Sequence, residues 1–360
     1  GGKDEVSRNI QPEAIPMKSV TTIGIDLAKN TFQLHGVNAQ GKPVLRKTLR
    51  RDQVVPFFAN LPECLVGMEA CGGSAYWART IEQCGHTVRR IHPRFIKPYL
   101  LAEKNDANDA AAICEAVSRP RMRFVPGKSQ EQTDIQAIHR VRRGFVQART
   151  AAINQARGLL AENGIVVRQG PSSLRLSLPI FIGDDNNGLS DIMRRLLRSL
   201  YEHIASLDES ILTQDNILKD IAKENEACKR LMKVPGIGVM TATILLTMVG
   251  TASDFKNGRQ FAAYLGLVPR QYSTGGKQIL LGITKHGDSY ARTLLVQGAR
   301  SVLRALQFSR HPLVQGGPGE WLLQLVDRRG TNRACVALAN KTARIVWNML
   351  HTGSEYKNAA

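Results

Sequence analysis

The chain has 360 residues, of which 43% are hydrophobic, and its 49 Lys and Arg against 30 Asp and Glu give a formal net charge of +19. This length predicts two or three domains, and the positive excess favours a polyanionic partner such as nucleic acid. No run of 18 apolar residues is present and the first 20 residues have mixed charge, so we expect neither a membrane anchor nor a secretion signal.

Residues 18–128 are predicted to form a mixed α/β domain, preceded by a disordered extension at 1–17. Residues 20–49 contain three strand-like segments with a turn at 39–42. Short apolar strands and helical segments then alternate, at 63–73, 75–85, 86–93 and 104–117. This order is typical of a sheet with helices packed on it.

Residues 129–228 are predicted to be a helical region. Apolar residues recur at helical spacing from 131 to 165 and from 189 to 221, which favours two long antiparallel helices or a coiled coil that serves as an oligomer contact. Between them, Pro, Gly and Asn punctuate residues 169–188, where we expect an inserted hairpin-like loop.

Residues 229–306 indicate a third compact and mostly helical domain, because short helical stretches separated by glycines replace the long helical pattern. Residues 307–360 then contain a loop and a strong final helix at 332–350. The six cysteines are scattered without a Cys-x-x-Cys pair, which favours reduced thiols in a cytosolic protein over disulfides or a zinc site.

Four carboxylates are candidates for a metal site. Asp26 and Glu69 each end an apolar strand, while Asp106 and Asp109 lie three apart and so share one helix face. Carboxylate oxygens suit Mg²⁺, and two such ions about 4 Å apart can stabilise the attacking and leaving oxygens of a phosphodiester displacement. The plainer interpretation of the helical pair is a solvated or capping pair; an Asp that closes an apolar strand is less easily explained.

A glycine-containing turn lies between two helical stretches, in VPGIG at 234–238. It resembles the helix-hairpin-helix element, in which backbone amides at a helix N-terminus bind a phosphate without reading sequence. Gly236 and Gly238 are therefore predicted to contact nucleic acid; the alternative is an ordinary tight helical turn.

Six motifs follow one another between residues 23 and 288: IGIDLAKN, MEACGG, KNDANDA, VPGIG, FAAYLGLVPRQYSTGGK and ITKHGD. The first three resemble the RNase H-like catalytic core of RuvC-type nucleases. The whole set resembles the transposases of DEDD-type insertion sequences related to the Piv invertase, a group of bridge-RNA or seeker-RNA guided recombinases.

This resemblance implies an N-terminal RuvC-like domain, a coiled-coil region and a C-terminal transposase domain with a nucleophilic serine. It implies Mg²⁺ or Mn²⁺ at the acidic site and a homo-oligomer, from dimer to tetramer, in which the serine of one subunit completes the acidic site of another. Its expected partners are double-stranded donor and target DNA and an element-encoded noncoding guide RNA that supplies sequence choice by base pairing. The expected location is the bacterial cytoplasm, at the nucleoid.

Residue by residue, the DEDD quartet matches Asp26, Glu69, Asp106 and Asp109. The nucleophile matches Ser273 or Thr274, depending on the motif from which it is counted. We choose Ser273, because a primary hydroxyl attacks phosphorus more readily than a β-branched one, and the adjacent Gly275 and Gly276 allow close backbone approach. Without the resemblance, a turn hydroxyl bonded to its own backbone explains the serine better.

Basic residues near these motifs are candidates for nucleic-acid contact. Lys277 and Lys285, with His286 and Arg292, are placed to balance charge at the reacting phosphate, and four arginines are expected to neutralise RNA or DNA backbone: Arg140, Arg142, Arg143 and Arg149. A general cationic face is the simpler interpretation. Two other functions stay open: a RuvC-like metal-dependent nuclease or Holliday junction resolvase in which water attacks, and a non-catalytic nucleic-acid-binding protein.

Overall fold

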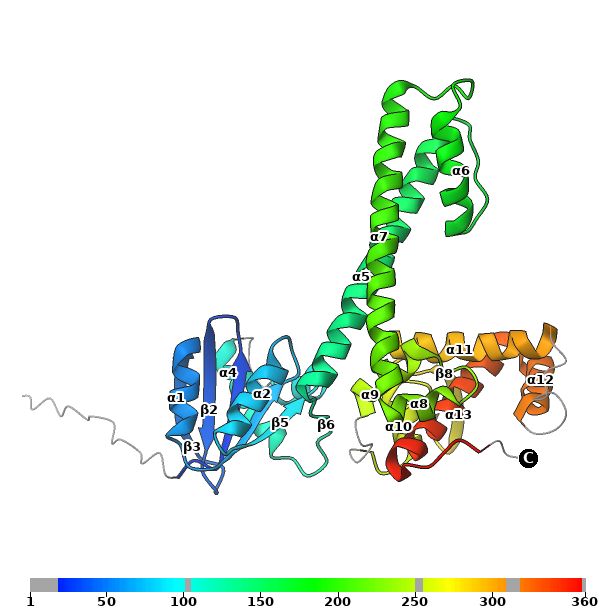
Figure 1. Ribbon diagram of the computed structural model, residues 1–360. Coiled ribbons are helices and arrows are strands. Elements are labelled where there is room, and N and C mark those ends of the chain that lie inside the picture. Colours follow the sequence, from blue (N-terminus) through cyan, green and yellow to red (C-terminus); the bar gives the residue numbers. More distant parts are fainter. Residues whose placement is uncertain (1–18, 101–104, 250–254, 309–317, 358–360) are drawn as a thin grey trace, which may run out of the picture. The chain divides into compact units, whose positions relative to one another are not determined.

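The computed structural model describes residues 19–100, 105–249, 255–308 and 318–357 (Figure 1). The predicted extension at 1–17 and most of the predicted loop after residue 307 lie outside these ranges. The chain divides into two compact units, Gly1–Gly127 and Lys128–Ala360. Within the described residues, no helix combines the length and the apolar character needed to cross a membrane.

The first unit is built on a six-stranded sheet with the order β3-β2-β1-β4-β5-β6. The strands are β1 (Thr22–Leu27), β2 (Thr31–Val37), β3 (Pro43–Arg50), β4 (Leu65–Glu69), β5 (Thr87–Ile91) and β6 (Phe124–Val125). Neighbouring strands in β1 to β3 are antiparallel, β1, β4 and β5 are parallel, and β6 is antiparallel to β5. The predicted mixed α/β character is confirmed, and the strand order is consistent with an RNase H-like domain.

The helices of the first unit are η2 (Arg51–Gln53), α1 (Val54–Ala59), α2 (Ser74–Gln83), α3 (Pro93–Ile96), η3 (Lys97–Tyr99) and α4 (Asp106–Val117). The side chains of β1 alternate between the two faces of the sheet. Ile23 and Ile25 are fully buried in one core with residues of α1 and α2, including Trp77, whose ring meets Phe32 edge to face at 4.9 Å. Gly24 lies on the other face, against α4.

Helix α4 lies directly against the backbone of the two central strands. A Cβ atom on Gly24 would lie 2.1 Å from the carbonyl oxygen of Ala110 and 2.4 Å from the amide nitrogen of Cys114. Gly67, the register partner of Gly24 on β4, leaves room for Val117, whose Cβ would lie 2.7 Å from an added Cβ. The absence of two side chains at neighbouring positions is therefore what lets α4 approach the sheet.

The second unit is mostly helical. Its elements are α5 (Gln130–Glu162), α6 (Pro171–Gly183), α7 (Asp191–Glu224), α8 (Glu226–Met232), α9 (Val239–Val249), α10 (Gly258–Tyr264), β7 (Pro269–Thr274), β8 (Lys277–Ile283), α11 (Ser289–Phe308), α12 (Pro318–Arg329) and α13 (Thr331–Thr352). The helices α5 and α7 have 33 and 34 residues and run antiparallel beside each other (Figure 1), as the apolar spacing predicts.

The prediction of a loop at 169–188 is wrong, because helix α6 occupies most of that segment. Pro171 stands in the first turn, where its missing N–H costs nothing and its fixed φ suits a helix. Leu174, Leu178 and Ile182 recur at steps of four, and all three are buried in one core with residues of α5 and α7. The helical spacing of these three apolar residues indicates a helix, but the Pro and Gly residues around them favour a loop when the sequence is considered alone.

The core of the second unit continues past residue 306, where the sequence suggested a domain boundary. Buried residues of α13, such as Cys335 and Val346, share one cluster with Leu245 of α9 and Leu295 of α11. The final helix therefore completes the core of the 229–306 region, since its apolar face has no other surface in the described chain on which to bury.

We expect Gly24→Ala to lower the free energy of unfolding of the first unit by about 1–3 kcal/mol or more, because the new methyl group meets backbone atoms of α4 that cannot rotate away. Urea unfolding measures this as a lower midpoint at an unchanged slope. Gly72→Ala is the matched control, because no atom lies within 4 Å of its added Cβ and its φ is not positive. Equal midpoints for the two variants would contradict the packing argument.

Candidate active site

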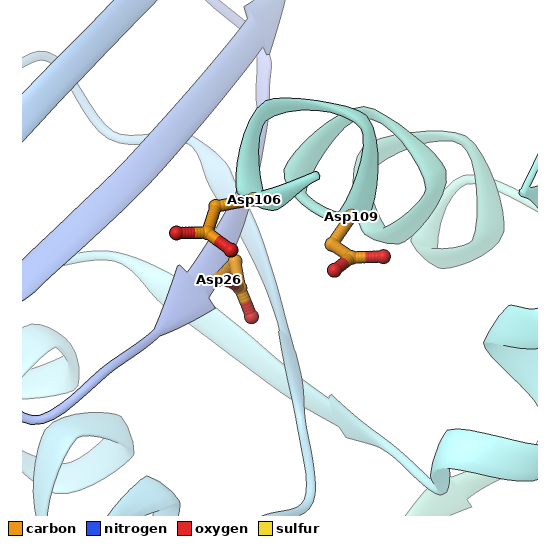
Figure 2. A group of neighbouring side chains, drawn as sticks. All are labelled: Asp26, Asp106 and Asp109. Carbon is orange, nitrogen blue, oxygen red and sulfur yellow. The ribbon is translucent and has the colours of Figure 1, made fainter. Parts of the chain in front are cut away.

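Three of the four predicted carboxylates converge at one end of the sheet. Figure 2 shows Asp26 on β1 with Asp106 and Asp109 from the first turn of α4. One carboxylate oxygen from each of the three lies within 4.8 Å of the others. Two of the side chains are half-buried and that of Asp106 is exposed, so the cluster opens to solvent.

The close approach of α4 to β1 creates this cluster. Asp26 lies two residues after Gly24 and so faces α4, while Asp109 precedes Ala110, the residue whose carbonyl oxygen occupies the space above Gly24. Asn105 fixes the start of α4 by accepting a hydrogen bond from the backbone N–H of Asn108 at 2.8 Å. The positive end of the helix dipole then lies beside the carboxylates and favours their charge.

The pKa of Asp26 is raised from 3.8 to about 6 at this position. Burial is the largest cause, and the charges of Asp109, Asp106 and Glu69 add to it in that order. Three converging oxygen ligands that repel one another fit a hard divalent cation, because the cation removes the repulsion and takes oxygen ligands.

Glu69 ends β4 beside Asp26. The parallel register pairs Ile25 with Met68, so the next residues, Asp26 and Glu69, lie on the face that carries α4. The charge of Glu69 helps to raise the pKa of Asp26, but its oxygens lie outside the 4.8 Å group. Cys71, which the sequence did not single out, lies near this site. The residue is exposed, but partial desolvation raises the pKa of its thiol, and the charges of Glu69 and Asp26 raise it further.

Ser273 and Thr274 end strand β7 of a β-hairpin in the second unit. Gly275 and Gly276 form its two-residue turn with φ values of 54° and 75°, a conformation that two glycines adopt without strain. The local sequence pattern predicts only a turn here, whereas the structure has paired strands on both sides of it. Every residue from Thr274 back to Pro269 is exposed.

The two candidate hydroxyls lie on opposite faces of this hairpin. Ser273 pairs with Gln278, and its Oγ accepts a hydrogen bond from the side-chain amide of Gln271 at 2.8 Å, two residues away on the same face. Thr274 pairs with Lys277 on the other face. The side chain of Lys277 therefore lies on the same face of the hairpin as Thr274 and on the opposite face from Ser273.

The base of the hairpin is tied to the core. Arg292 donates hydrogen bonds to the carbonyl oxygens of Leu265 and His286, both at 3.0 Å, and the amide of Lys285 donates to the carbonyl of Gly266 at 3.1 Å. Asp288 accepts from the amides of Tyr290 and Ala291 and so caps α11. In the described structure, Arg292 thus holds the hairpin base, while the side chains of Lys277 and Lys285 are exposed.

The four predicted arginines of α5 divide into two kinds. Arg142 pairs with Asp215 and Arg149 with Asp208, the latter at 2.7 Å, so both link α5 to α7. Arg143 lies over the ring of Tyr290, with 5.7 Å from its guanidinium carbon to the ring centre, and Arg140 is exposed. Exposure leaves Arg140 and Arg143 as the better candidates for phosphate contact.

The two predicted glycines of the VPGIG turn also differ. The φ of Gly236 is +86°, and a Cβ there would lie 2.8 Å from the carbonyl oxygen of Gly298 on α11, so packing alone accounts for this glycine. Gly238 is exposed immediately before α9, with no atom within 4 Å of an added Cβ. Its surroundings leave room for a ligand at the backbone.

We expect Asp26→Asn to raise the midpoint of thermal unfolding in metal-free buffer, and to do so more at a pH of about 7.5 than at about 5. The folded-state pKa is about 6 and the ordinary value is 3.8, so the folded chain binds more protons between them and ionisation of Asp26 lowers stability as pH rises through that window. Differential scanning calorimetry measures the effect, with the exposed Glu82→Gln as control. A difference independent of pH would refute this assignment.

Comparison with known proteins gives two family matches. Residues 23–164 match a family model for DEDD transposases of the IS110 type, described as "Transposase". Residues 228–312 match a second model, described as "Transposase IS116/IS110/IS902 family". The first match contains all four carboxylates, and the second contains the hairpin with Ser273.

Similar proteins cover nearly the whole chain. It is 45% identical over 340 residues to a "Probable family 20 transposase" of Pseudomonas aeruginosa, covering 94% of this chain and 99% of the relative. It is 43% identical over 344 residues to the "Transposase for insertion sequence element IS1111A" of Coxiella burnetii, covering 96% and 93%. A "Pilin gene-inverting protein" of Moraxella lacunata is 25% identical over 319 residues, covering 82% and 86%. The chain therefore belongs to the IS116/IS110/IS902 family of insertion-sequence transposases.

Proposed function

We propose that this transposase is an RNA-guided DNA recombinase, which cuts and rejoins donor and target strands through a covalent link between Ser273 and a phosphodiester. The observation that supports the proposal is that one chain carries both an open acidic cluster and, at the tip of an anchored hairpin, an exposed hydroxyl. An acidic metal-binding cluster alone would be enough for a nuclease that uses water. An acidic cluster together with a nucleophilic hydroxyl fits strand cleavage followed by rejoining.

The acidic cluster is proposed to hold Mg²⁺ or Mn²⁺. Asp26, Asp106 and Asp109 would bind the ion, with Glu69 beside them. Burial and, after it, the charges of the other carboxylates raise the pKa of Asp26, and a cation would relieve the repulsion among them. A divalent ion at this place supplies a Lewis acid that neutralises charge on a phosphodiester.

Ser273 is proposed as the nucleophile. Its Oγ forms a bond to phosphorus, the bond from phosphorus to the 3′ oxygen breaks, and the hydroxyl proton leaves Oγ while the 3′ oxygen takes up a proton. Attack of another 3′ hydroxyl on the phosphoserine reverses these steps and restores the serine. The phosphodiester bond energy is conserved throughout, so rejoining needs no ATP.

Its placement supports Ser273 over Thr274. The side-chain amide of Gln271 donates to Ser273 Oγ, which leaves the hydroxyl proton free to point elsewhere, and no β-methyl group hinders the oxygen. Gly275 and Gly276 have no atom within 4 Å of an added Cβ, so the hairpin tip offers open space to a DNA backbone.

The proposed partners are double-stranded donor and target DNA and a noncoding RNA encoded by the element. A net charge of +19 supports polyanion binding, and exposed cations such as Arg140 and Lys277 are candidates for phosphate contact. Gly238 at the start of α9 is the candidate for a helix-hairpin-helix phosphate contact. We further propose that the protein acts as a dimer or tetramer whose subunits share sites.

Ser273→Ala and Asp26→Ala are each expected to abolish recombination, and reactions of the unaltered chain stopped midway should contain DNA attached to protein at Ser273. Denaturing electrophoresis followed by mass spectrometry of the nucleotide-modified peptide locates the attachment. Thr274→Ser is the matched control, because it keeps both hydroxyls and should remain active.

Each alternative gives a different result. An adduct at Thr274 would refute the residue assignment but keep the covalent mechanism. Water-cut ends without an adduct, with cleavage retained in Ser273→Ala, would indicate a RuvC-like nuclease. Nucleic-acid binding without strand breakage in Mg²⁺ would indicate a non-catalytic protein.

A mixture of two inactive variants tests whether subunits share the site. We consider a mixture of chains with Asp26→Ala and chains with Ser273→Ala. If acids and serine come from different subunits, a site is active when its acids come from a Ser273→Ala chain and its serine from an Asp26→Ala chain. Random assembly then makes roughly a quarter of the sites active. Recombination of co-expressed chains carrying two different affinity tags measures this. No recovery from verified mixed oligomers would place acids and serine in the same subunit.

A further inference from the structure

A large open groove lies in the C-terminal part of the second unit, away from the residues discussed above. Its volume is about 1030 Å³, and it is lined by the start of α10, by one face of α13, by Trp321 of α12 and by residues 354–357. Gly258 of α10 packs against the backbone of Arg344, where an added Cβ would lie 3.1 Å from Cα. The walls therefore come from segments about 100 residues apart in the chain that the core holds together.

The groove is strongly positive. Four cations line it, Arg259, Lys341, Arg344 and Lys357, and all four are exposed. None of them forms an ion pair with a carboxylate of the described residues. The one acidic residue in the lining, Glu355, is paired at 2.8 Å with Lys233, so it does not offset them.

Aromatic rings are interleaved with these cations. Trp321, Trp347 and Tyr356 line the groove and are half-buried, so each is held by the core yet keeps part of its ring accessible. The ammonium of Lys341 lies 5.0 Å from the centre of the Trp321 ring, and Trp347 stacks on His351 with 4.8 Å between ring centres. Such contacts restrain the rings and reduce the entropy that a ligand would otherwise lose in ordering them.

The shape of α13 and of the segment after it keeps these groups on one surface. Lys341, Arg344 and Asn348 recur at steps of three and four and so share a face of α13. Gly353 then adopts a left-handed conformation with φ 69° and ends the helix. The ammonium group of Lys233 donates a hydrogen bond to the carboxylate of Glu355 and so restrains the segment in which Tyr356 and Lys357 line the groove.

From this combination we infer that the groove binds a single-stranded segment of nucleic acid. Unpaired bases expose faces that stack on indole and phenol rings, while the phosphates between them pair with the four cations. A duplex hides its base faces, so it would leave the rings without a partner. The inference rests on the proposed function only in taking nucleic acid as the substrate, because neither Ser273 nor the acidic cluster contributes to the groove.

Unpaired nucleotides of this transposase have two sources, the guide RNA and a DNA strand separated from its complement. Both supply the same chemistry of stacked bases and phosphates. The test therefore uses fluorescein-labelled RNA and DNA of one sequence and about 12 nucleotides, together with the DNA duplex, measured by anisotropy. The full-length chain carries Ser273→Ala throughout, so strand chemistry does not affect the result.

Trp321→Ala should weaken binding of the single strands by about five- to a hundredfold, and Trp321→Phe should keep most of the affinity because it keeps a ring for stacking. The double variant with Arg259→Gln and Arg344→Gln loses two exposed cations. The slope of log affinity against log salt concentration for single strands should therefore become less steep by about 1.4. The control replaces Arg195 and Arg198, which are exposed on α7 outside the groove, by Gln. Duplex binding should not respond to Trp321→Ala.

A second readout reports stacking itself. The chain has three tryptophans, and Trp77 lies in the other unit, so Trp77→Phe leaves only the two groove residues to fluoresce. Single strands should quench this emission, and duplex should not. Tighter binding of RNA would assign the groove to the guide, and tighter binding of DNA to a displaced strand.

Unchanged affinity and salt dependence in the groove variants, or equal losses in the α7 control, would overturn the inference. Failure of the proposed serine chemistry would look different, because no DNA would attach to Ser273 while the groove variants still lost oligonucleotide binding. The arginine variants lie on exposed positions and keep the test valid if Trp321→Ala fails to fold.

Discussion

The close contact between helix α4 and strand β1 is the constraint on which the acidic site depends. Gly24 lets the carbonyl of Ala110 and the amide of Cys114 approach the strand backbone, and Gly67 does the same for Val117 on the neighbouring strand. That contact places the first turn of α4 beside Asp26, where three carboxylates gather, and burial together with their mutual repulsion raises the pKa of Asp26. Ionised Asp26 lowers the stability of the fold at the place where a cation would be bound, and strongly shifted pKa values of this kind are common at functional sites.

The β7–β8 hairpin of the second unit also depends on contacts with the core, but these contacts hold only its base. Its base is held by hydrogen bonds from Arg292 and by the capping of α11 by Asp288, whereas its tip has no packing partner within the described chain. Two-stranded hairpins are marginally stable in water by themselves, so the anchor at the base is what keeps Ser273 presented. Exposed apolar side chains on both strands, such as Tyr272 and Leu280, are then available to contact a substrate or another subunit.

The positive charge of the chain has two distinct uses. Arg142 and Arg149 are half-buried and hold α5 against α7 through Asp215 and Asp208, so they stabilise the long helices. The cations of the C-terminal groove have no such partners among the described carboxylates and lie among aromatic rings. The net charge of +19 counts the paired arginines and the groove cations together. It therefore predicts a polyanionic partner but does not indicate where that partner binds.

The sequence by itself determined strands β1 to β5 and helices α2 and α4 of the first unit, the two long helices and the order of motifs that identifies the family, because these depend on local periodicity and residue type. It also placed Asp106 and Asp109 on one helix face. Only the tertiary structure decided that α4 brings them to Asp26, that α13 completes the core of the 229–306 region and that Arg259 and Lys357 share a groove. Those relations join residues far apart in the chain, and they follow from which surfaces can pack closely, a property that no local pattern carries.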